Sequence, residues 1–155
     1  MELQEIFNKA HKHFAGMTEP SMADIDGIGD ENLKCAYRGE DGNKCIVGAF
    51  IPDSLYDDSL EGDSLDPMGE YSSSGYFSFY NTRVTDVLAL AFKQERLTDD
   101  QYILLGSLQK LHDRNAEDWR DGFQYHTEVS WYEFIKHEII NCGEKFNLKT
   151  NQGEV

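Results

Sequence analysis

The sequence lacks any long apolar run. No stretch approaches the roughly 20 apolar residues that a membrane-spanning helix needs. The first 15 residues are amphipathic and not continuously apolar, which is untypical of a signal peptide. The chain also has only three cysteines, an odd number that, without an export signal, indicates reduced thiols. We therefore expect a cytoplasmic protein with no membrane partner.

Basic residues are scarce relative to acidic ones. Lys and Arg number 14 against 29 Asp and Glu, so the formal net charge is −15. This balance disfavours direct binding to nucleic acid, because phosphates need a basic face to displace their counterions. It disfavours anionic membrane surfaces for the same reason. The partners it favours are a basic protein surface or cations, while the simplest interpretation is that the charge serves solubility.

The sequence motifs of the common catalytic and phosphate-binding sites are missing as well. The chain contains no G-x-x-x-x-G-K-[ST], G-x-G-x-x-G, H-E-x-x-H or G-x-S-x-G pattern. The acidic stretch "DIDGIGDE" fails the EF-hand template, because glycine falls at position 4 and Cys35 at position 12 counted from Asp24. We therefore predict no cofactor, no metal centre and no catalytic residue, and we expect a protein that is not an enzyme.

The most distinctive stretch that is present is "CAYRGEDGNKCIVGAFIPD", residues 35–53. Its Asp-Gly dipeptide favours a tight turn and "KCIVGAF" is typical of a strand, so we predict a β-hairpin over residues 34–50. A two-residue turn places Cys35 and Cys45 on opposite faces, and a three-residue turn places them diagonally, about 7–8 Å apart. Neither register suits a disulfide or a shared zinc ion, so buried structural thiols are favoured. A catalytic thiol would need a base such as His112 or His126.

Four segments show the 3.6-residue apolar period of amphipathic helices, and they are residues 2–15, 82–95, 99–113 and 129–142. Thr98 and Gln101 form a capping box before the third, and His112 falls near its end. Asp53 is placed to cap a further short helix, and "AEDWRDGF" predicts another turn or two. The predicted fold class is α+β, with four or five helices packed around a small antiparallel β-hairpin or three-stranded sheet. We expect one globular domain over residues 1–148 and a frayed tail over 149–155.

The polar residues of the 35–53 stretch belong to a longer pattern. It reads roughly C-x-Y-R-x-x-x-G-x-K-C-x-x-G-x-x-I-P-D-x-x-Y, then L-E-G, then L-x-x-L-Q-x-x-H-D. This pattern resembles that of a widespread group of small uncharacterised bacteriophage and prophage proteins. The resemblance covers about residues 1–123. It implies a phage accessory protein made in the cytoplasm of a bacterial host, and proteins of that kind often block or divert host machinery.

The first hypothesis of function combines this resemblance with the acidic charge. It is a non-enzymatic protein that binds and neutralises a host factor with a basic surface, such as a defence protein or a nucleic-acid-handling protein. An acidic run would carry that contact, and its residues are Asp57, Asp58, Glu61, Asp63 and Asp66.

Two alternatives belong to other classes. One is a pocket protein that sequesters or cleaves a small nucleotide-like molecule. Its candidate ligand-binding residues are Tyr37, Arg38, Lys44, Gln109, His112 and Asp113. The other is a structural or assembly protein that forms a homo-oligomer through the aromatic segment 71–80, which contains "YFSFY", and the last helix.

Overall fold

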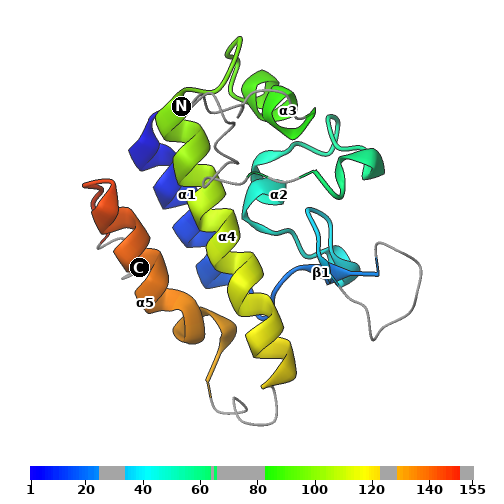
Figure 1. The fold of residues 1–155 in the computed structure, drawn as a ribbon, viewed down its shortest axis with the longest axis vertical. Helices are drawn as coiled ribbons and strands as arrows, with labels where there is room; N and C mark the ends of the chain where they lie inside the picture. Colours follow the sequence, from blue (N-terminus) through cyan, green and yellow to red (C-terminus); the bar gives the residue numbers. More distant parts are fainter. Residues whose placement is uncertain (25–33, 64, 66–82, 123–128, 151–155) are drawn as a thin grey trace, which may run out of the picture.

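The computed structural model describes residues 1–24, 34–63, 65, 83–122 and 129–150. Within these ranges the chain forms five α-helices, two short strands and two 3-10 helices (Figure 1). The elements in chain order are α1 (Leu3–Gly16), β1 (Met22–Ala23), β2 (Lys34–Cys35), η2 (Glu40–Gly42), α2 (Ile46–Phe50), η3 (Asp58–Leu60), α3 (Arg83–Ala91), α4 (Asp99–Asp121) and α5 (Trp131–Lys145). The fold is therefore α+β, as predicted, and dominated by helix.

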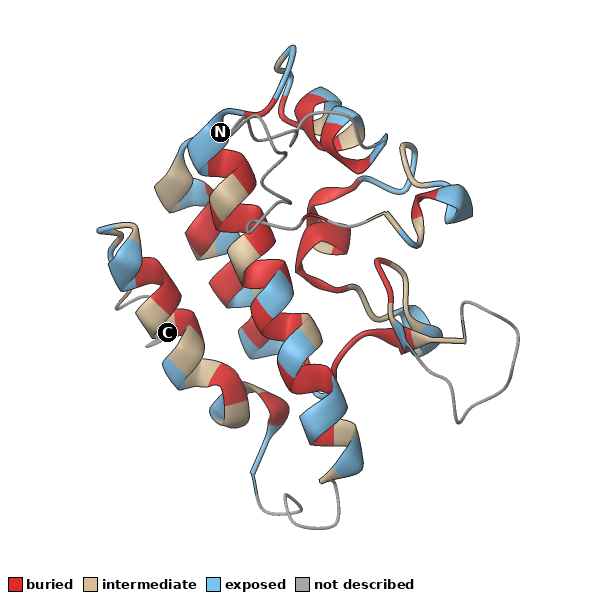
Figure 2. Ribbon diagram, viewed as in Figure 1, coloured by how far each residue is buried: buried red, intermediate tan, exposed pale blue. Residues whose placement is uncertain are grey.

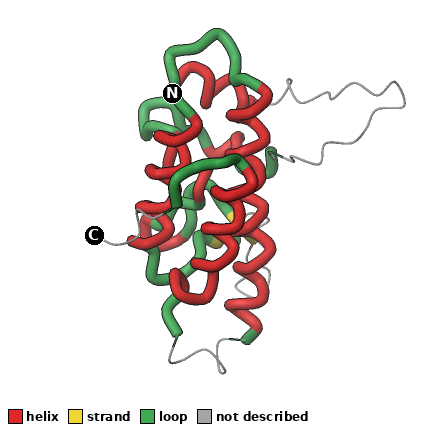
Figure 3. The backbone as a smooth tube through the Cα atoms, turned by 90° about the vertical axis from the view of Figure 1, so that its left-hand side faces the viewer, coloured by secondary structure: helices red, strands yellow, loops and turns green. Residues whose placement is uncertain are grey.

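Three long helices form the body of the molecule. α1, α4 and α5 each pack against the other two, and the shorter α2 packs against α1 and α4. In the view turned by 90°, the long helices run along the vertical axis (Figure 3). None of the helices in the described ranges is long and apolar enough to cross a membrane.

Helix α1 confirms the prediction made from apolar spacing. Ile6, Phe7, Ala10 and Phe14 are fully buried on one face. The close contact between α1 and α5 depends on Gly143 of α5, since a Cβ at that position would lie 2.6 Å from the ring of Phe7. The amphipathic pattern thus specifies both the helix and the face that it buries.

Helix α4 begins where the capping box predicts. The Thr98 hydroxyl accepts a hydrogen bond from the Gln101 backbone N–H at 3.1 Å, and the Gln101 side chain accepts one from the Thr98 N–H at 3.0 Å. The helix continues past residue 113 to Asp121, so the prediction that it ends near His112 is wrong. No glycine or proline stands between His112 and Gly122, and the buried face of the helix continues through Ala116 and Trp119.

The β-hairpin predicted over residues 34–50 is also wrong. The Asp-Gly dipeptide lies in η2, and the expected second strand is the helix α2. The small antiparallel sheet instead pairs β1 with β2, with Met22 opposite Cys35. The further prediction that Asp53 caps a helix fails as well, because Asp57 caps η3 instead, accepting from the Ser59 N–H at 2.8 Å.

Helix α2 forms although its sequence favours a strand. Its residues are buried or nearly so over the whole length (Figure 2), and a short run buried on all sides has no period that separates helix from strand. The Cys45 sulfur caps it, accepting from the Gly48 N–H at 3.4 Å. The Gln109 side-chain oxygen, on α4, accepts from the Val47 N–H at 3.0 Å. These tertiary partners satisfy the free N–H groups of the first turn and override local propensity.

The closest approach around α2 gives a test of this packing. A Cβ at Gly48 would lie 2.1 Å from the Tyr37 carbonyl oxygen, so Gly48→Ala should displace backbone and destabilise the fold by about 1–3 kcal/mol. Gly16→Ala is the matched control, because nothing lies within 4 Å of its Cβ position. Urea denaturation of both variants checks this, and equal stability of Gly48→Ala and the wild type would contradict the packing described.

Candidate functional site

The residues of the sequence pattern meet where the segment 34–63 packs against α4. Arg38 reaches back over the C-terminal end of α2. Its guanidinium donates to the carbonyl oxygens of Gly48 at 2.6 Å and Ile51 at 2.7 Å, and to the Asp53 carboxylate at 3.1 Å. The same group lies 4.6 Å from the ring centroid of Tyr56. Arg38 therefore serves the free carbonyls at the end of a helix, which charged donors stabilise.

Glu61 performs the complementary task for backbone N–H groups. One carboxylate oxygen accepts from the Tyr37 N–H at 3.0 Å, and the other accepts from the Arg38 N–H at 2.9 Å and from the Tyr56 hydroxyl at 2.9 Å. Its side chain is half-buried. Glu61 was predicted within an acidic contact surface, and the structure shows its carboxylate turned toward the chain's own backbone.

Helix α4 contributes a polar cluster in which Gln109 and His112 are buried and Asp113 is partly exposed. The His112 ring is fully buried, and its Nε2 accepts a hydrogen bond from the Ser21 backbone N–H at 3.0 Å. Because Nε2 is an acceptor, Nδ1 carries the proton and donates to Asp113 Oδ1 at 2.9 Å. The same carboxylate oxygen accepts from the Gln109 amide at 2.5 Å. Hydrogen bonding therefore fixes the tautomer of His112 as neutral and protonated at Nδ1.

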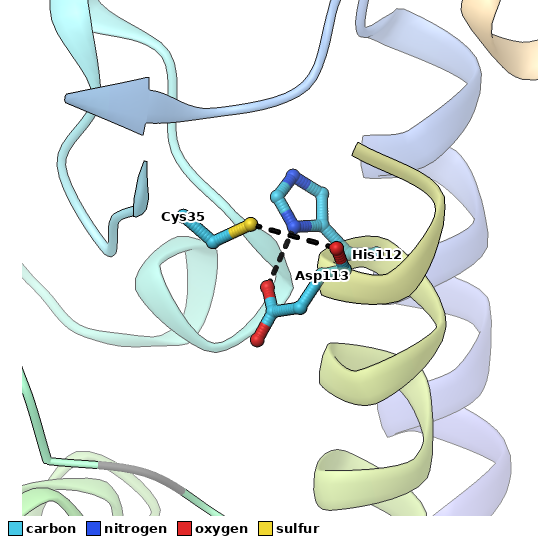
Figure 4. Close-up of side chains that lie close together, drawn as sticks. All are labelled: Cys35, His112 and Asp113. Carbon is cyan, nitrogen blue, oxygen red and sulfur yellow. Dashed lines mark hydrogen bonds and ion pairs between the residues drawn. The ribbon is translucent and has the colours of Figure 1, made fainter. Parts of the chain in front are cut away.

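Cys35 completes a Cys-His-Asp group (Figure 4). One ligand-type atom from each residue lies within 4.8 Å of the other two, which is compatible with a metal site. A metal on Nδ1 of His112 would move the imidazole proton to Nε2, where the Ser21 N–H already points. The Cys35 thiol donates to the Asp113 carbonyl oxygen at 3.8 Å. The protons of the cluster are thus committed to internal hydrogen bonds, which disfavours metal binding.

The same geometry disfavours thiol catalysis. Burial raises the pKa of Cys35, and the nearby Asp113 carboxylate raises it further, so the nucleophilic thiolate is absent near neutral pH. Burial also raises the pKa of Cys45, whose sulfur caps α2. His112 is not placed to act as the base for this thiol, because its unprotonated nitrogen Nε2 already accepts a hydrogen bond from the Ser21 backbone N–H.

The remaining ligand-binding candidates also bond within the chain. The Tyr37 hydroxyl donates to the Asp63 carbonyl oxygen, and burial raises the pKa of Tyr37. The Lys44 ammonium lies 3.2 Å from the Asp53 carboxylate. The six candidates therefore divide into a hydrogen-bonded network of three on α4, the ion pairs of Arg38 and Lys44 with Asp53, and Tyr37, which bonds separately to Asp63.

The acidic run divides differently. Asp57 and Asp58 are exposed, and Asp63 is half-buried. The pKa of Asp57 is lowered by hydrogen bonds from Ser59, which keeps this carboxylate ionised. Asp66 and the aromatic segment 71–80 lie outside the described residues.

Sequence reasoning missed Ser21, which joins three parts of the structure. Its N–H donates to His112, and its hydroxyl bonds to the carbonyl oxygens of Ala36 at 2.9 Å and Asn43 at 3.2 Å. A lone serine after Pro20 carries no motif, so no local signal marks it. The role becomes visible only when the distant segments are brought together.

Comparisons with known proteins add no identification. No family model matches the chain, and neither the curated proteins nor the solved structures contain a match.

The backbone contacts of Glu61 give a second test. Glu61→Gln leaves a single acceptor oxygen for three donors, so we expect a loss of about 1–3 kcal/mol in the free energy of unfolding. Asp58→Asn removes a charge of the same sign from an exposed position and should cost little. Chemical denaturation measures both, and equal effects would show that Glu61 acts by charge alone.

The protonated thiols give a third test. In native protein, alkylation by iodoacetamide near neutral pH should be much slower at all three cysteines than in urea-unfolded protein, because burial raises each thiol pKa. As pH rises Cys142 should react first, since its pKa is raised only to about 11. Peptide mass spectrometry follows each site. Rapid labelling of Cys35 at pH 7 would contradict the proton assignment.

Proposed function

We propose that this protein is a non-enzymatic binding protein that docks onto a basic surface of a protein partner. The observation that carries the proposal is the contrast between the two sets of polar residues. In one set, the polar side chains of the 34–63 segment and α4 form hydrogen bonds within the chain, as Arg38, Glu61 and His112 do. In the other set, exposed carboxylates remain accessible to the basic groups of a partner.

The contact surface in this proposal centres on Asp57 and Asp58. Both residues are exposed, and they lie at the start of η3, where Asp57 is the N-cap and Asp58 the first residue. Asp53 lies nearby in the chain with its side chain 84% exposed. The net charge of −15 adds a long-range attraction for a basic partner and repels nucleic acid.

The resemblance to phage accessory proteins supports a host factor as this partner. In that setting the protein would neutralise a defence protein or a nucleic-acid-handling protein, whose basic surface normally faces phosphates. Acidic side chains can bind such a surface without catalysing a reaction. This agrees with the Cys-His-Asp group, whose side chains are hydrogen-bonded to one another and to the backbone.

Neither alternative function gains a comparable observation. The proposed nucleotide pocket relied on six side chains, and all six are used in internal contacts, although Lys44 also lines a cavity. For a homo-oligomer, the apolar face of α5 is already buried inside the chain through Trp131, Ile135 and Ile139.

A matched pair of variants tests the proposal. Asp57→Asn with Asp58→Lys removes two negative charges and adds one positive charge, and it keeps a side-chain oxygen to accept from the Ser59 N–H. Glu117→Gln with Asp118→Lys adds the same charge to exposed positions of α4. We expect the first pair to reduce recovery of a basic bacterial protein by at least about fivefold, and the second pair to leave it nearly unchanged.

Quantitative pull-down from a bacterial lysate at low and high salt, read by mass spectrometry, measures this recovery. Capture by the wild type should fall as salt rises. Equal losses of recovery with the two pairs of substitutions would show that only the net charge matters and not the Asp57/Asp58 surface. Retention of the partner by the Asp57/Asp58 pair would place the contact elsewhere.

A further inference from the structure

A cavity of about 500 Å³ lies between the C-terminal half of α1 and residues 42–49, beside α2. This volume falls within the range of about 300–1,000 Å³ typical of small-molecule sites. Its charged and titratable lining side chains are Lys9, Lys12, His13 and Lys44. No carboxylate of the described residues lines it, although acidic residues outnumber basic ones 29 to 14 in the chain. The cavity is therefore a basic site in an acidic protein.

Ordinary structural roles explain only part of this arrangement. Lys12 and His13 lie near the C-terminal end of α1, where the helix dipole favours positive charge. Lys44 comes from a different segment, and its backbone carbonyl oxygen holds the His13 ring by accepting from Nε2 at 2.6 Å. The helix dipole gives no reason for a third lysine to face the same space from the opposite side.

The nearest carboxylates leave part of the positive charge available. Asp53 lies 3.2 Å from the Lys44 ammonium, and the same carboxylate oxygen also bonds Arg38. Glu19 accepts from the Asn43 amide at 3.2 Å. Lys12 is exposed and forms no ion pair within the described part of the chain. Lys9 lies 4.7 Å from the ring centroid of Phe50.

The state of His13 supports an anion as the missing partner. Because Nε2 donates to a carbonyl oxygen, Nδ1 is the nitrogen free to take a proton. Burial lowers the pKa of His13, the hydrogen bond to the Lys44 carbonyl oxygen partly opposes this, and the neighbouring His112, Lys44 and Lys9 lower the pKa further. The unliganded cavity thus holds several like charges together, and Asp53 is the one carboxylate of the described residues that is ion-paired with any of them. A bound anion removes this repulsion and favours the protonated ring.

We propose that the cavity binds the phosphate group of a small organic phosphate, which Lys9, Lys12 and Lys44 hold as point charges. Near neutral pH a phosphate monoester carries close to two negative charges, which matches several ammonium groups better than one carboxylate does. No aromatic face of the described cavity is open for base stacking, because Phe50 is only 3% exposed and lies beneath Lys9. The site therefore recognises the phosphate and not a base. This inference is independent of the acidic docking surface.

The side chain of Lys12 provides a clean variant. Lys12→Gln removes one charge from the cavity without breaking a hydrogen bond or ion pair of the described chain. Lys93→Gln is the matched control, since Lys93 is exposed just after α3 and does not line the cavity. Both variants change the net charge equally, and neither threatens the fold.

The experiment is an NMR titration of the His13 imidazole in the full-length protein, with inorganic phosphate, pyrophosphate or ATP at matched ionic strength. In the wild type we expect pyrophosphate to raise the pKa of His13 by about one unit at saturation. Lys12→Gln should weaken binding at least about fivefold, while Lys93→Gln should bind as the wild type does. His137, exposed on α5, serves as an internal reference.

The possible outcomes separate the ligand sources. Equal affinity for pyrophosphate and ATP supports recognition of the phosphate alone, and clearly tighter binding of ATP would contradict a site that does not recognise the base. The proposal is overturned if no probe shifts His13, or if Lys12→Gln and Lys93→Gln weaken the shift equally.

Discussion

The structure depends on hydrogen-bond partners for buried backbone N–H and C=O groups that lie outside regular helices and sheets. Residues 34–63 run across α4 and α1 with two residues of strand and one short α-helix. Such a path leaves N–H and C=O groups buried, and each unpaired group costs about 1–3 kcal/mol. Side chains therefore replace the missing secondary structure. Arg38 serves carbonyls, Glu61 serves N–H groups, and α4 serves both the Val47 and Ser21 N–H groups.

This constraint gives the polar residues of the 35–53 stretch and of α4 a physical role. Cysteine, histidine and aspartate in close contact are often taken as a catalytic or metal group. In this structure the Cys35 thiol donates to the Asp113 carbonyl oxygen, His112 accepts from a backbone amide, and the Asp113 carboxylate accepts from both Gln109 and His112. Each residue type is required because of its donors and acceptors at a fixed place. The pattern therefore marks a fold, and function has to be sought on the surfaces that the fold presents.

The elements that the sequence predicts well are those whose signals are local. The apolar spacing of α1 and the Thr98–Gln101 capping box lie within a few turns of chain, and both predictions are confirmed. α2 was predicted as a strand from its apolar and β-branched residues, and the Gln109 side chain that accepts from its Val47 N–H lies 62 residues away in the sequence. For the same reason the sequence could not show that Cys35, His112 and Asp113 lie close together. Nor does any local sequence feature indicate that the Glu61 carboxylate binds backbone N–H groups. Long-range hydrogen bonds decide these parts of the structure.

The two proposed surfaces act over different distances. The net charge of −15 produces a field that attracts a basic partner while it is still separated from the protein. At physiological ionic strength this field is screened beyond about 8 Å. Inside the cavity the ammonium groups of Lys9, Lys12 and Lys44 face a common space, so their local attraction for an anion outweighs the screened repulsion of distant carboxylates. An acidic protein can therefore hold a phosphate in one place and a basic partner in another.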